Sequence, residues 1–324
     1  MSSGEITIVY VTHRPRPRFE WFADGLAAQL GEEAPELIVV DGLPSPERAE
    51  EMAAIVAGRF PFRHVAAKPN PVNGPARLTS SEYTAVSSAR NTGVVHATGA
   101  YVVFADDLAV PMPGWWDQVR QAAEDEYVVA GAYQKHRGME VSDGVLAGSC
   151  SDPSGIDTRW PQGSDSRPVP IGGGQLYGCS FGVPHDLLLE VNGQDEICNT
   201  IGGEDYQLGL RLEWAGAPIL YSRRMLTVES EEGHDQAPVM LRIGQTLDEA
   251  AYMAKLAEFG VERRSTDGAF DNSHMVLDIL YGARATASVG NYYDLAQLTE
   301  ADLPATTERF PVCHWFDGKP LAEM

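Results

Sequence analysis

The chain has 324 residues, of which 44% are apolar and 22% charged, a composition that indicates a globular protein and excludes a disordered chain. Its 24 basic and 46 acidic residues give a net charge of −22, so nucleic acid and anionic membrane surfaces are not expected partners. The cysteines lack C-x-x-C or zinc spacing, and neither a signal peptide nor an apolar run of membrane-spanning length is evident. We therefore expect a soluble, cytoplasmic protein without integral membrane association.

Short apolar strands alternate with helices in the first seventy residues. The helix expected over residues 45–58 begins with Ser45 as its cap and Pro46 at its first position. The alternation predicts a mostly parallel sheet covered by helices on both faces, that is, a Rossmann-like α/β fold. The expected strands lie in residues 5–15, 36–42 and 62–69, the first helix lies in 18–31, and residues 69–81 are expected to form an exposed loop.

Polar residues follow the expected strands at the ends where a parallel sheet binds ligands. A helix over 82–99 leads into the strand "YVVFADD", which ends in Asp106 and Asp107. Thr12 to Arg14 follow the first strand, and Asp41 ends the second. Because ligands bind beyond the carboxyl ends of strands in open α/β sheets, these three loops are expected to converge on one crevice.

The second half of the chain differs in composition and in the order of its expected elements. Residues 142–175 are rich in Gly, Ser, Asp and Pro, which predicts a loop that could act as a lid over bound substrate. The elements around it are a strand in 128–138, a strand and a helix in 178–193, a helix and a strand in 202–224, and amphipathic helices in 246–260 and 273–285.

Two adjacent carboxylates at a strand end need compensation by a cation, a hydrogen-bond donor or open water. Mg²⁺ and Mn²⁺ prefer oxygen ligands and often join carboxylates to substrate phosphates, so a divalent metal is the strongest candidate for Asp106 and Asp107. A solvated turn is the alternative. Neither a phosphate-binding G-x-x-x-x-G-K motif nor a dinucleotide-binding G-x-G-x-x-G motif follows the first strand.

A second acidic motif, "IGGEDYQLG", places Glu204 and Asp205 at the start of an expected helix. Helix capping alone accounts for acids at this position, because the helix dipole favours them by about 0.3–1 kcal/mol. The two preceding glycines indicate a closer backbone approach than a cap requires.

These stretches together resemble the nucleotide-sugar glycosyltransferases of the GT-A fold, in particular glycosyltransferase family 2. The resemblance is carried by "ITIVYVTHRP", "ELIVVDG", "SSARNTGVVHATGAYVVFADDLAVPMPGWW" and "IGGEDYQLGLRLEWAGAPILY", within residues 5–222. It implies a nucleotide-sugar-binding half in 1–115, an acceptor-binding and catalytic half of the same domain in 116–235, and a C-terminal helical extension in 236–324.

The resemblance also implies roles for individual residues. Asp205 matches the catalytic base and Glu204 a residue that holds acceptor hydroxyls, although the two roles could be exchanged. For the metal, Asp107 matches the metal-binding carboxylate of the DxD motif and His234 a second ligand. For the donor, Asp106 matches a contact to the sugar or ribose, Asp41 the residue that recognises the nucleobase, and Arg90 a residue near the nucleotide. The first donor-binding loop is matched by Thr12, His13 and Arg14.

The implied function is transfer of a sugar from a nucleoside-diphosphate sugar to an acceptor hydroxyl, with Mn²⁺ or Mg²⁺ and with inversion. The acceptor is expected to be a small molecule, an oligosaccharide or a protein. The alternatives are a non-catalytic nucleotide- or carbohydrate-binding GT-A protein and a retaining enzyme; nucleotidyl transfer ranks last because no Gly-rich phosphate loop follows the first strand. Trp115, Trp116 and Trp214 could stack on sugar rings, although tryptophan more often packs in a core.

Overall fold

The structure is a computed structural model, and it describes residues 5–68, 85–147, 153–199, 203–233, 249–264, 272–288, 291 and 293–305. Its centre is a 10-stranded sheet whose main path runs β10-β12-β6-β11-β4-β1-β2-β3. The predicted α/β fold with a mostly parallel sheet is confirmed. The expected loop at 69–81 lies outside the described residues.

The first half of the chain builds the parallel side of the sheet, as the sequence predicts. Strands β4, β1, β2 and β3 pair in parallel, and β1 and β2 are in register with Thr12 opposite Asp41. The carboxyl ends of these strands therefore meet at one edge. The strands are β1 (Ile6–Thr12), β2 (Glu36–Asp41), β3 (Phe62–Ala66) and β4 (Tyr101–Asp106).

The second half extends the same sheet with both parallel and antiparallel pairings. Strand β11 (Ser180–Pro184) is antiparallel to both β4 and β6 (Val128–His136), so β6 runs in the same direction as β4. Strand β12 (Ile219–Ser230) pairs in parallel with β6. The ends of β6 and β12 thus reach the edge at which β1, β2 and β4 end.

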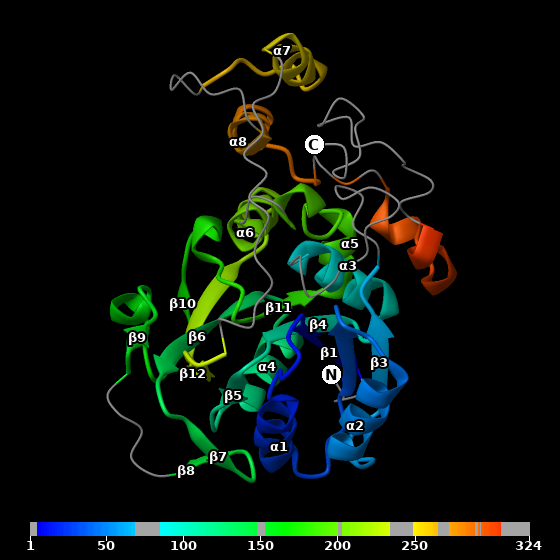
Figure 1. The fold of residues 1–324 in the computed structure, drawn as a ribbon. Coiled ribbons are helices and arrows are strands. Elements are labelled where there is room, and N and C mark those ends of the chain that lie inside the picture. The colour runs from blue at the N-terminus through cyan, green and yellow to red at the C-terminus, as the bar shows by residue number, and fades with distance from the viewer. Residues whose placement is uncertain are drawn as a thin grey trace.

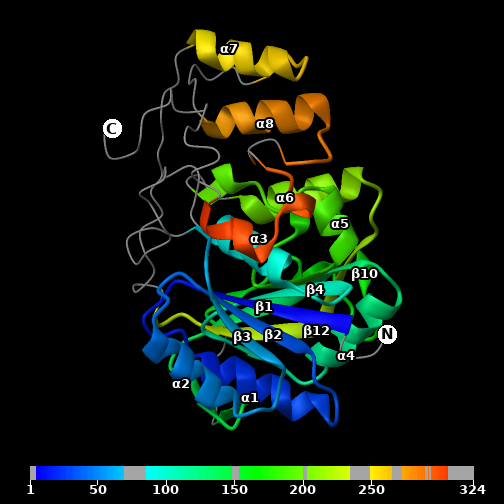
Figure 2. The same cartoon turned by 90° about the vertical axis from the view of Figure 1, so that its right-hand side faces the viewer.

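Helices cover both faces of the sheet, and they are best seen in Figure 2. One face carries α1 (Phe19–Leu30), α2 (Pro46–Val56) and α4 (Trp115–Glu124), and the other carries α3 (Val86–His96), α5 (His185–Glu190) and α6 (Glu204–Trp214). Each face has its own cluster of buried apolar residues. Trp115 and Trp116 lie inside the first cluster and are fully buried, so they pack in the core.

Local sequence signals explain where these helices begin, end and pack. Ser45 caps α2 by accepting a hydrogen bond from the backbone of Arg48, as expected. Gly31 ends α1 with a φ of 60°. Gly93 lets α3 lie directly on β1, because a Cβ there would come within 2.2 Å of Val9 Cγ1.

The segment 142–175 contains more structure than the sequence predicts. Its two-residue strands β9 (Gly155–Ile156) and β10 (Val169–Pro170) pair with β6 and β12, respectively, and such short pairings leave no hydrophobic periodicity. A small hairpin of β7 (Glu140–Ser142) and β8 (Val145–Ala147) lies before them, and β5 (Ala109–Pro111) pairs with β12. Short 3₁₀ turns occur at Trp160–Gln162 and Gly173–Gln175.

The C-terminal region contains the two expected helices, α7 (Glu249–Glu258) and α8 (Asn272–Ala283), stacked beyond α6 (Figure 1). Trp214 of α6 meets Tyr281 of α8 with ring centroids 6.1 Å apart. The chain then returns to α3 and α5, where Tyr293 and Leu295 are buried in the second core cluster. Two 3₁₀ turns follow, at Leu295–Gln297 and Glu300–Ala305.

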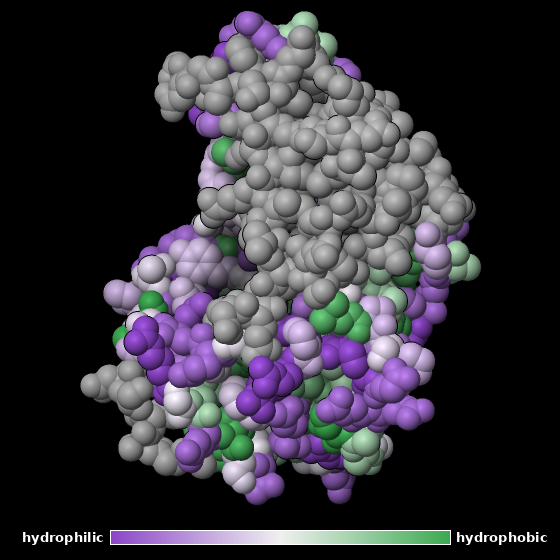
Figure 3. Space-filling view, viewed as in Figure 1, coloured by the Kyte–Doolittle hydropathy of each residue, from purple (hydrophilic) through white to green (hydrophobic). Residues whose placement is uncertain are grey.

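The coloured part of the surface in Figure 3 is largely hydrophilic, with small apolar areas scattered over it. Few large apolar side chains in the described ranges are exposed, and they are Val145, Ile156 and Met253. The described part of the chain contains no helix that is long and apolar enough to cross a membrane.

Candidate active site

The two adjacent carboxylates after β4 face different surroundings. Strand β4 is buried until Asp106, whose side chain is 39% exposed and accepts a hydrogen bond from Arg90 Nη2 at 2.9 Å. Asp107 is buried, and it accepts hydrogen bonds from Thr12 Oγ1 at 2.8 Å and from Arg14 Nη1 at 2.5 Å. Leu108 follows with a φ of 61°, which turns the chain back toward the sheet. Asp106 is therefore the acid of the pair that is open to a ligand.

Asp41, the residue expected to recognise a nucleobase, is fully buried among protein partners. Arg48 Nε donates to its Oδ2 at 2.7 Å, His64 Nε2 lies 3.0 Å from the same oxygen, and the Leu43 backbone donates to Oδ1 at 2.8 Å. Burial alone would raise the pKa of Asp41, but these hydrogen bonds hold it below its ordinary value. Arg48 also donates to the Arg14 carbonyl at 3.1 Å, so the first two loops do converge.

His13, in the loop after β1, is buried and has one ring nitrogen without a hydrogen bond to any described residue. Its Nε2 has no hydrogen-bond partner within the described part of the chain. Burial lowers the pKa of His13 to about 4, against the attraction of Asp41, so the ring is neutral at pH 7. A buried polar atom without a partner is costly, and a ligand group that bonded to it would remove that cost.

Arg90 joins the two acidic motifs that the sequence places 98 positions apart. Its guanidinium is 2% exposed and donates to Asp106 at 2.9 Å, to the Gly178 carbonyl at 3.1 Å and to Asp205 Oδ1. Glu204 Oε1 lies 4.0 Å from the same group. The geometry brings Arg90, Asp106, Glu204 and Asp205 together, as expected for parts of one site.

Two of the acids around Arg90, Glu204 and Asp106, have pKa values above those of ordinary carboxyls. Burial and the neighbouring Asp205 raise the pKa of Glu204 to about 7, although Arg90 opposes the change. Burial likewise raises the pKa of Asp106 to about 6 against the attraction of Arg90. Glu204 can therefore take up or release a proton near neutral pH, which is characteristic of acid–base sites.

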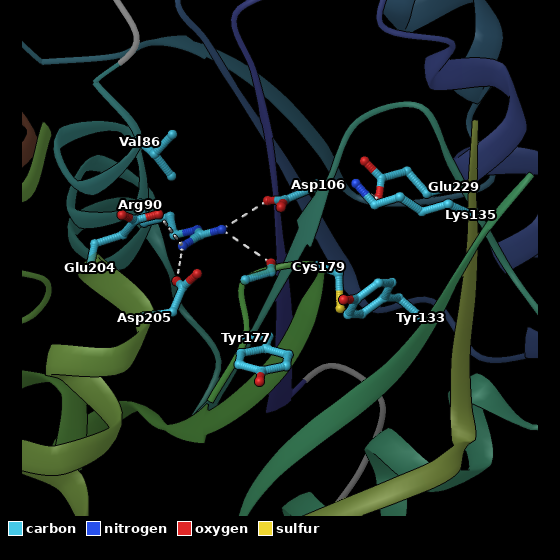
Figure 4. Close-up of a pocket in the computed structure, with 11 residues that line it drawn as sticks. Val86, Arg90, Asp106, Tyr133, Lys135, Tyr177, Cys179, Glu204, Asp205 and Glu229 are labelled. Atoms are coloured by element: carbon cyan, nitrogen blue, oxygen red, sulfur yellow. Dashed lines mark hydrogen bonds and ion pairs between the residues drawn. The ribbon is translucent and has the colours of Figure 1, made fainter. Parts of the chain in front are cut away.

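These side chains open into a pocket of about 370 Å³, shown in Figure 4. Arg90, Glu204 and Asp205 gather at one end, Lys135 and Glu229 lie at the other, and Asp106 projects between them. Its lining residues are Val86, Arg90, Asp106, Tyr133, Lys135, Tyr177, Gly178, Cys179, Glu204, Asp205 and Glu229. Thr12, His13, Arg14, Asp41 and Asp107 are not among them.

Lys135 and Glu229 are pocket residues that the sequence analysis missed. They are the last residues but one of β6 and β12, and Lys135 Nζ lies 3.5 Å from Glu229 Oε2. The rule that strand ends bind ligands would have selected both residues if the direction of β6 and β12 had been known. Tyr133 and Tyr177 carry no sequence signal of this kind.

A buried polar network connects Asp205 to the C-terminal region. Gln194 Nε2 donates to Asp205 Oδ1 at 3.1 Å. Asn91, which follows Arg90, fixes the Gln194 backbone through hydrogen bonds of 2.8 Å to both its N–H and its carbonyl. Asn291 donates to the same carbonyl at 2.9 Å, and Tyr293 and Asn91 both donate to Glu196. The segment around residue 291 is thus part of the support of the site.

The expected metal site is described only in part. Asp106 offers a carboxylate in the pocket that suits Mg²⁺ or Mn²⁺, whereas the Asp107 carboxylate is engaged by Thr12 and Arg14. Within the described ranges no three His, Cys, Asp or Glu side chains gather closely enough to hold a metal ion. His234 lies outside the described residues.

Comparisons with known proteins support the fold. Residues 24–177 match the family model of glycosyl transferase family 2, and no curated protein matches the chain in sequence. GalNAc-T7 with UDP, GalNAc and Mn²⁺ is similar in structure, with a TM-score of 0.55 and 12% identity over 87% of this chain and 55% of that one. S. aureus TarS 1-349 in complex with UDP-GlcNAc is also similar, with a TM-score of 0.52 and 12% identity over 96% of this chain and 72% of that one.

The chain spans 43% of the length of a longer S. aureus TarS structure. The family match includes β4, Arg90 and the Asp106–Asp107 pair, and the structural similarity extends over most of the sheet and its helices. On these grounds residues 24–177 resemble glycosyl transferase family 2, and the chain has the GT-A fold.

Proposed function

We propose that the chain transfers a sugar from a nucleoside-diphosphate sugar to an acceptor hydroxyl, with inversion at the anomeric carbon. The proposal is carried by one observation: Arg90 holds Asp106, at the end of β4, and Asp205, at the start of α6, in a single pocket. A donor sugar at Asp106 would thus lie next to a carboxylate able to activate an acceptor. UDP-sugars are the first donors to test, because the similar structures contain UDP or UDP-GlcNAc.

In the proposed reaction Asp205 accepts the proton of the acceptor hydroxyl as that oxygen forms its bond to the anomeric carbon. The bond from the anomeric carbon to the diphosphate breaks at the same time, and the diphosphate leaves with the electron pair. Glu204 holds acceptor hydroxyls. The exchanged assignment, with Glu204 as base, is favoured by its pKa of about 7 and by the ion pair that engages Asp205.

The donor is proposed to lie along the first two loops. His13 Nε2 would bond to its base or ribose, and Arg14 and Thr12 line the approach to Asp107. Bound Mn²⁺ or Mg²⁺ would neutralise the charge that develops on the diphosphate. We propose Asp106 as one ligand of the ion, because its carboxylate lines the pocket. Asp107 and His234 remain the other proposed ligands, Asp107 after release from Arg14 and Thr12.

Two measurements test the proposal. Calorimetric titration with UDP-sugars, with and without Mn²⁺, should show donor binding that Mn²⁺ strengthens, and Asp106→Asn should reduce this strengthening. Transfer assays should show that Asp205→Asn abolishes turnover while donor binding survives. Normal turnover of Asp205→Asn would show that the base assignment is wrong, and loss of turnover in Glu204→Gln alone would assign the base to Glu204.

A non-catalytic nucleotide- or sugar-binding protein is the second candidate. It is favoured by the ion pairs Arg14–Asp107 and Arg90–Asp205, which engage two of the expected functional acids. Donor binding without donor hydrolysis or transfer to any acceptor would support it. For an active enzyme, the anomeric configuration of the product, read by NMR, separates inversion from retention.

A further inference from the structure

The pocket has an aromatic wall, built from Tyr133 on β6 and Tyr177 just before β11 (Figure 4). Their ring centroids are 6.4 Å apart and the ring planes are inclined by 57°, so the two rings form a corner. The tryptophans considered for sugar stacking lie elsewhere: Trp115 and Trp116 are in the core, and Trp214 packs on Tyr281. Among the residues that the structure describes, Tyr133 and Tyr177 are the aromatic side chains that line this pocket.

Tyr177 is held in place by a buried arginine. The Arg159 guanidinium lies 4.3 Å from the centroid of the Tyr177 ring and is itself fully buried. Asp157 accepts three hydrogen bonds from it, of 2.7, 2.9 and 3.2 Å, and the carbonyl of Gly131 accepts another at 2.7 Å. The Tyr177 hydroxyl lies 3.0 Å from Thr158 Oγ1. The ring is thus oriented before any ligand arrives, which reduces the ordering cost of binding.

The backbone connects this ring directly to the acidic end of the pocket. Gly178 follows Tyr177 and accepts a hydrogen bond from Arg90 at 3.1 Å. A Cβ at Gly178 would come within 2.4 Å of Asp205 Oδ2, so this part of the chain touches the carboxylate itself. A molecule lying on Tyr177 would therefore have its edge at Glu204 and Asp205.

We propose that the acceptor is itself a sugar, a pyranoside whose ring stacks on Tyr177 and directs one hydroxyl to the Glu204–Asp205 pair. A pyranose has a flat face of C–H groups and a rim of hydroxyls. An aromatic face beside two carboxylates complements both. A linear polyol or a peptide serine lacks the flat apolar face. This inference rests on the proposed function, and it narrows the acceptor from any hydroxyl to a carbohydrate ring.

The test compares three acceptor types with whichever UDP-sugar the protein binds: methyl pyranosides, the linear polyol ribitol and a serine-containing peptide. Methyl pyranosides should be the preferred acceptors. Tyr177→Leu should raise the acceptor KM by about tenfold and leave the donor Kd unchanged. Tyr177→Phe, which keeps the ring, should keep the acceptor KM within about threefold. Trp160→Leu is the matched control: Trp160 stacks on Arg223 outside the pocket lining, so the acceptor KM should not change.

The outcomes separate this inference from the proposed function. If no UDP-sugar binds or reacts, the proposed function itself fails. If a UDP-sugar binds and is transferred with preference to ribitol or the peptide, only the sugar-acceptor inference is overturned. An unchanged acceptor KM in a folded Tyr177→Leu protein, with thermal unfolding as the folding check, would also overturn it.

Discussion

Replacing Glu204 by Gln should stabilise the fold at alkaline pH while it impairs the proposed activity. The pKa of Glu204 is raised from 4.5 to about 7, so the folded chain binds this proton more tightly than the unfolded chain does. The stability that this tighter binding provides is present below pH 4.5 and is lost as the pH rises toward 7. The pKa difference corresponds to about 3 kcal/mol, because each pKa unit is worth about 1.4 kcal/mol.

Glutamine has the shape of protonated glutamate and never ionises, so the variant avoids this loss. The free energy of unfolding of Glu204→Gln should exceed that of the unsubstituted chain by about 3 kcal/mol at pH 8 and by less than about 1 kcal/mol at pH 5. Urea unfolding at the two pH values measures both differences. Glu213→Gln, on the exposed side of the same helix, is the control and should change stability little at either pH.

A stability difference that is the same at pH 5 and pH 8 would refute this reasoning, because it would show that ionisation of Glu204 in the folded chain costs nothing. A gain at pH 8 accompanied by a higher acceptor KM would instead show that the site keeps a destabilising charge for the sake of its function.

Two further variants probe how the site is supported. Asn291→Ala removes side-chain hydrogen bonds to the backbones of Asn192, Gln194 and Glu196, and it should lower kcat about tenfold at unchanged donor Kd. Gln297→Ala, which loses only a local exposed bond, should change neither quantity. A fall in thermal stability without any change in kcat for Asn291→Ala would contradict this prediction. Gly178→Ala should abolish turnover with little loss of stability, because the alanine Cβ would displace the Asp205 carboxylate. Full turnover of this variant in steady-state assays would show that the carboxylate does not need its present position.

The sequence predicts the sheet and the location of the site because both depend on local patterns. Alternating apolar strands and helices indicate a parallel sheet, and polar residues at strand ends such as Asp41 and Asp106 indicate its ligand-binding edge. Side chains alternate along an extended chain, so Asp106 and Asp107 should diverge. Which of the two faces the pocket depends on Arg14 and Arg90, and no local pattern shows where those guanidinium groups lie.

Contacts between distant parts of the chain could not be predicted, because they leave no local pattern in the sequence. Nothing in the local sequence distinguishes Arg90 from any other arginine in a helix, yet it pairs with Asp205, which lies 115 positions later in the chain. Tyr177 becomes a pocket residue because Arg159, in a stretch that looks like a loop, is buried against the sheet. The return of Tyr293 and Leu295 to the second core cluster depends on single contacts between distant residues, which have no periodicity.

The buried return of the C-terminal segment has a practical consequence for dividing the gene. A fragment ending near residue 235 contains every strand of the sheet and both acidic motifs. It would nevertheless leave the Lys68–Glu196 ion pair without the ring of Tyr293 and would uncover the apolar surface beneath Leu295. Expression of such a fragment should yield aggregated protein, and a useful boundary must lie beyond Glu300, which pairs with Arg63.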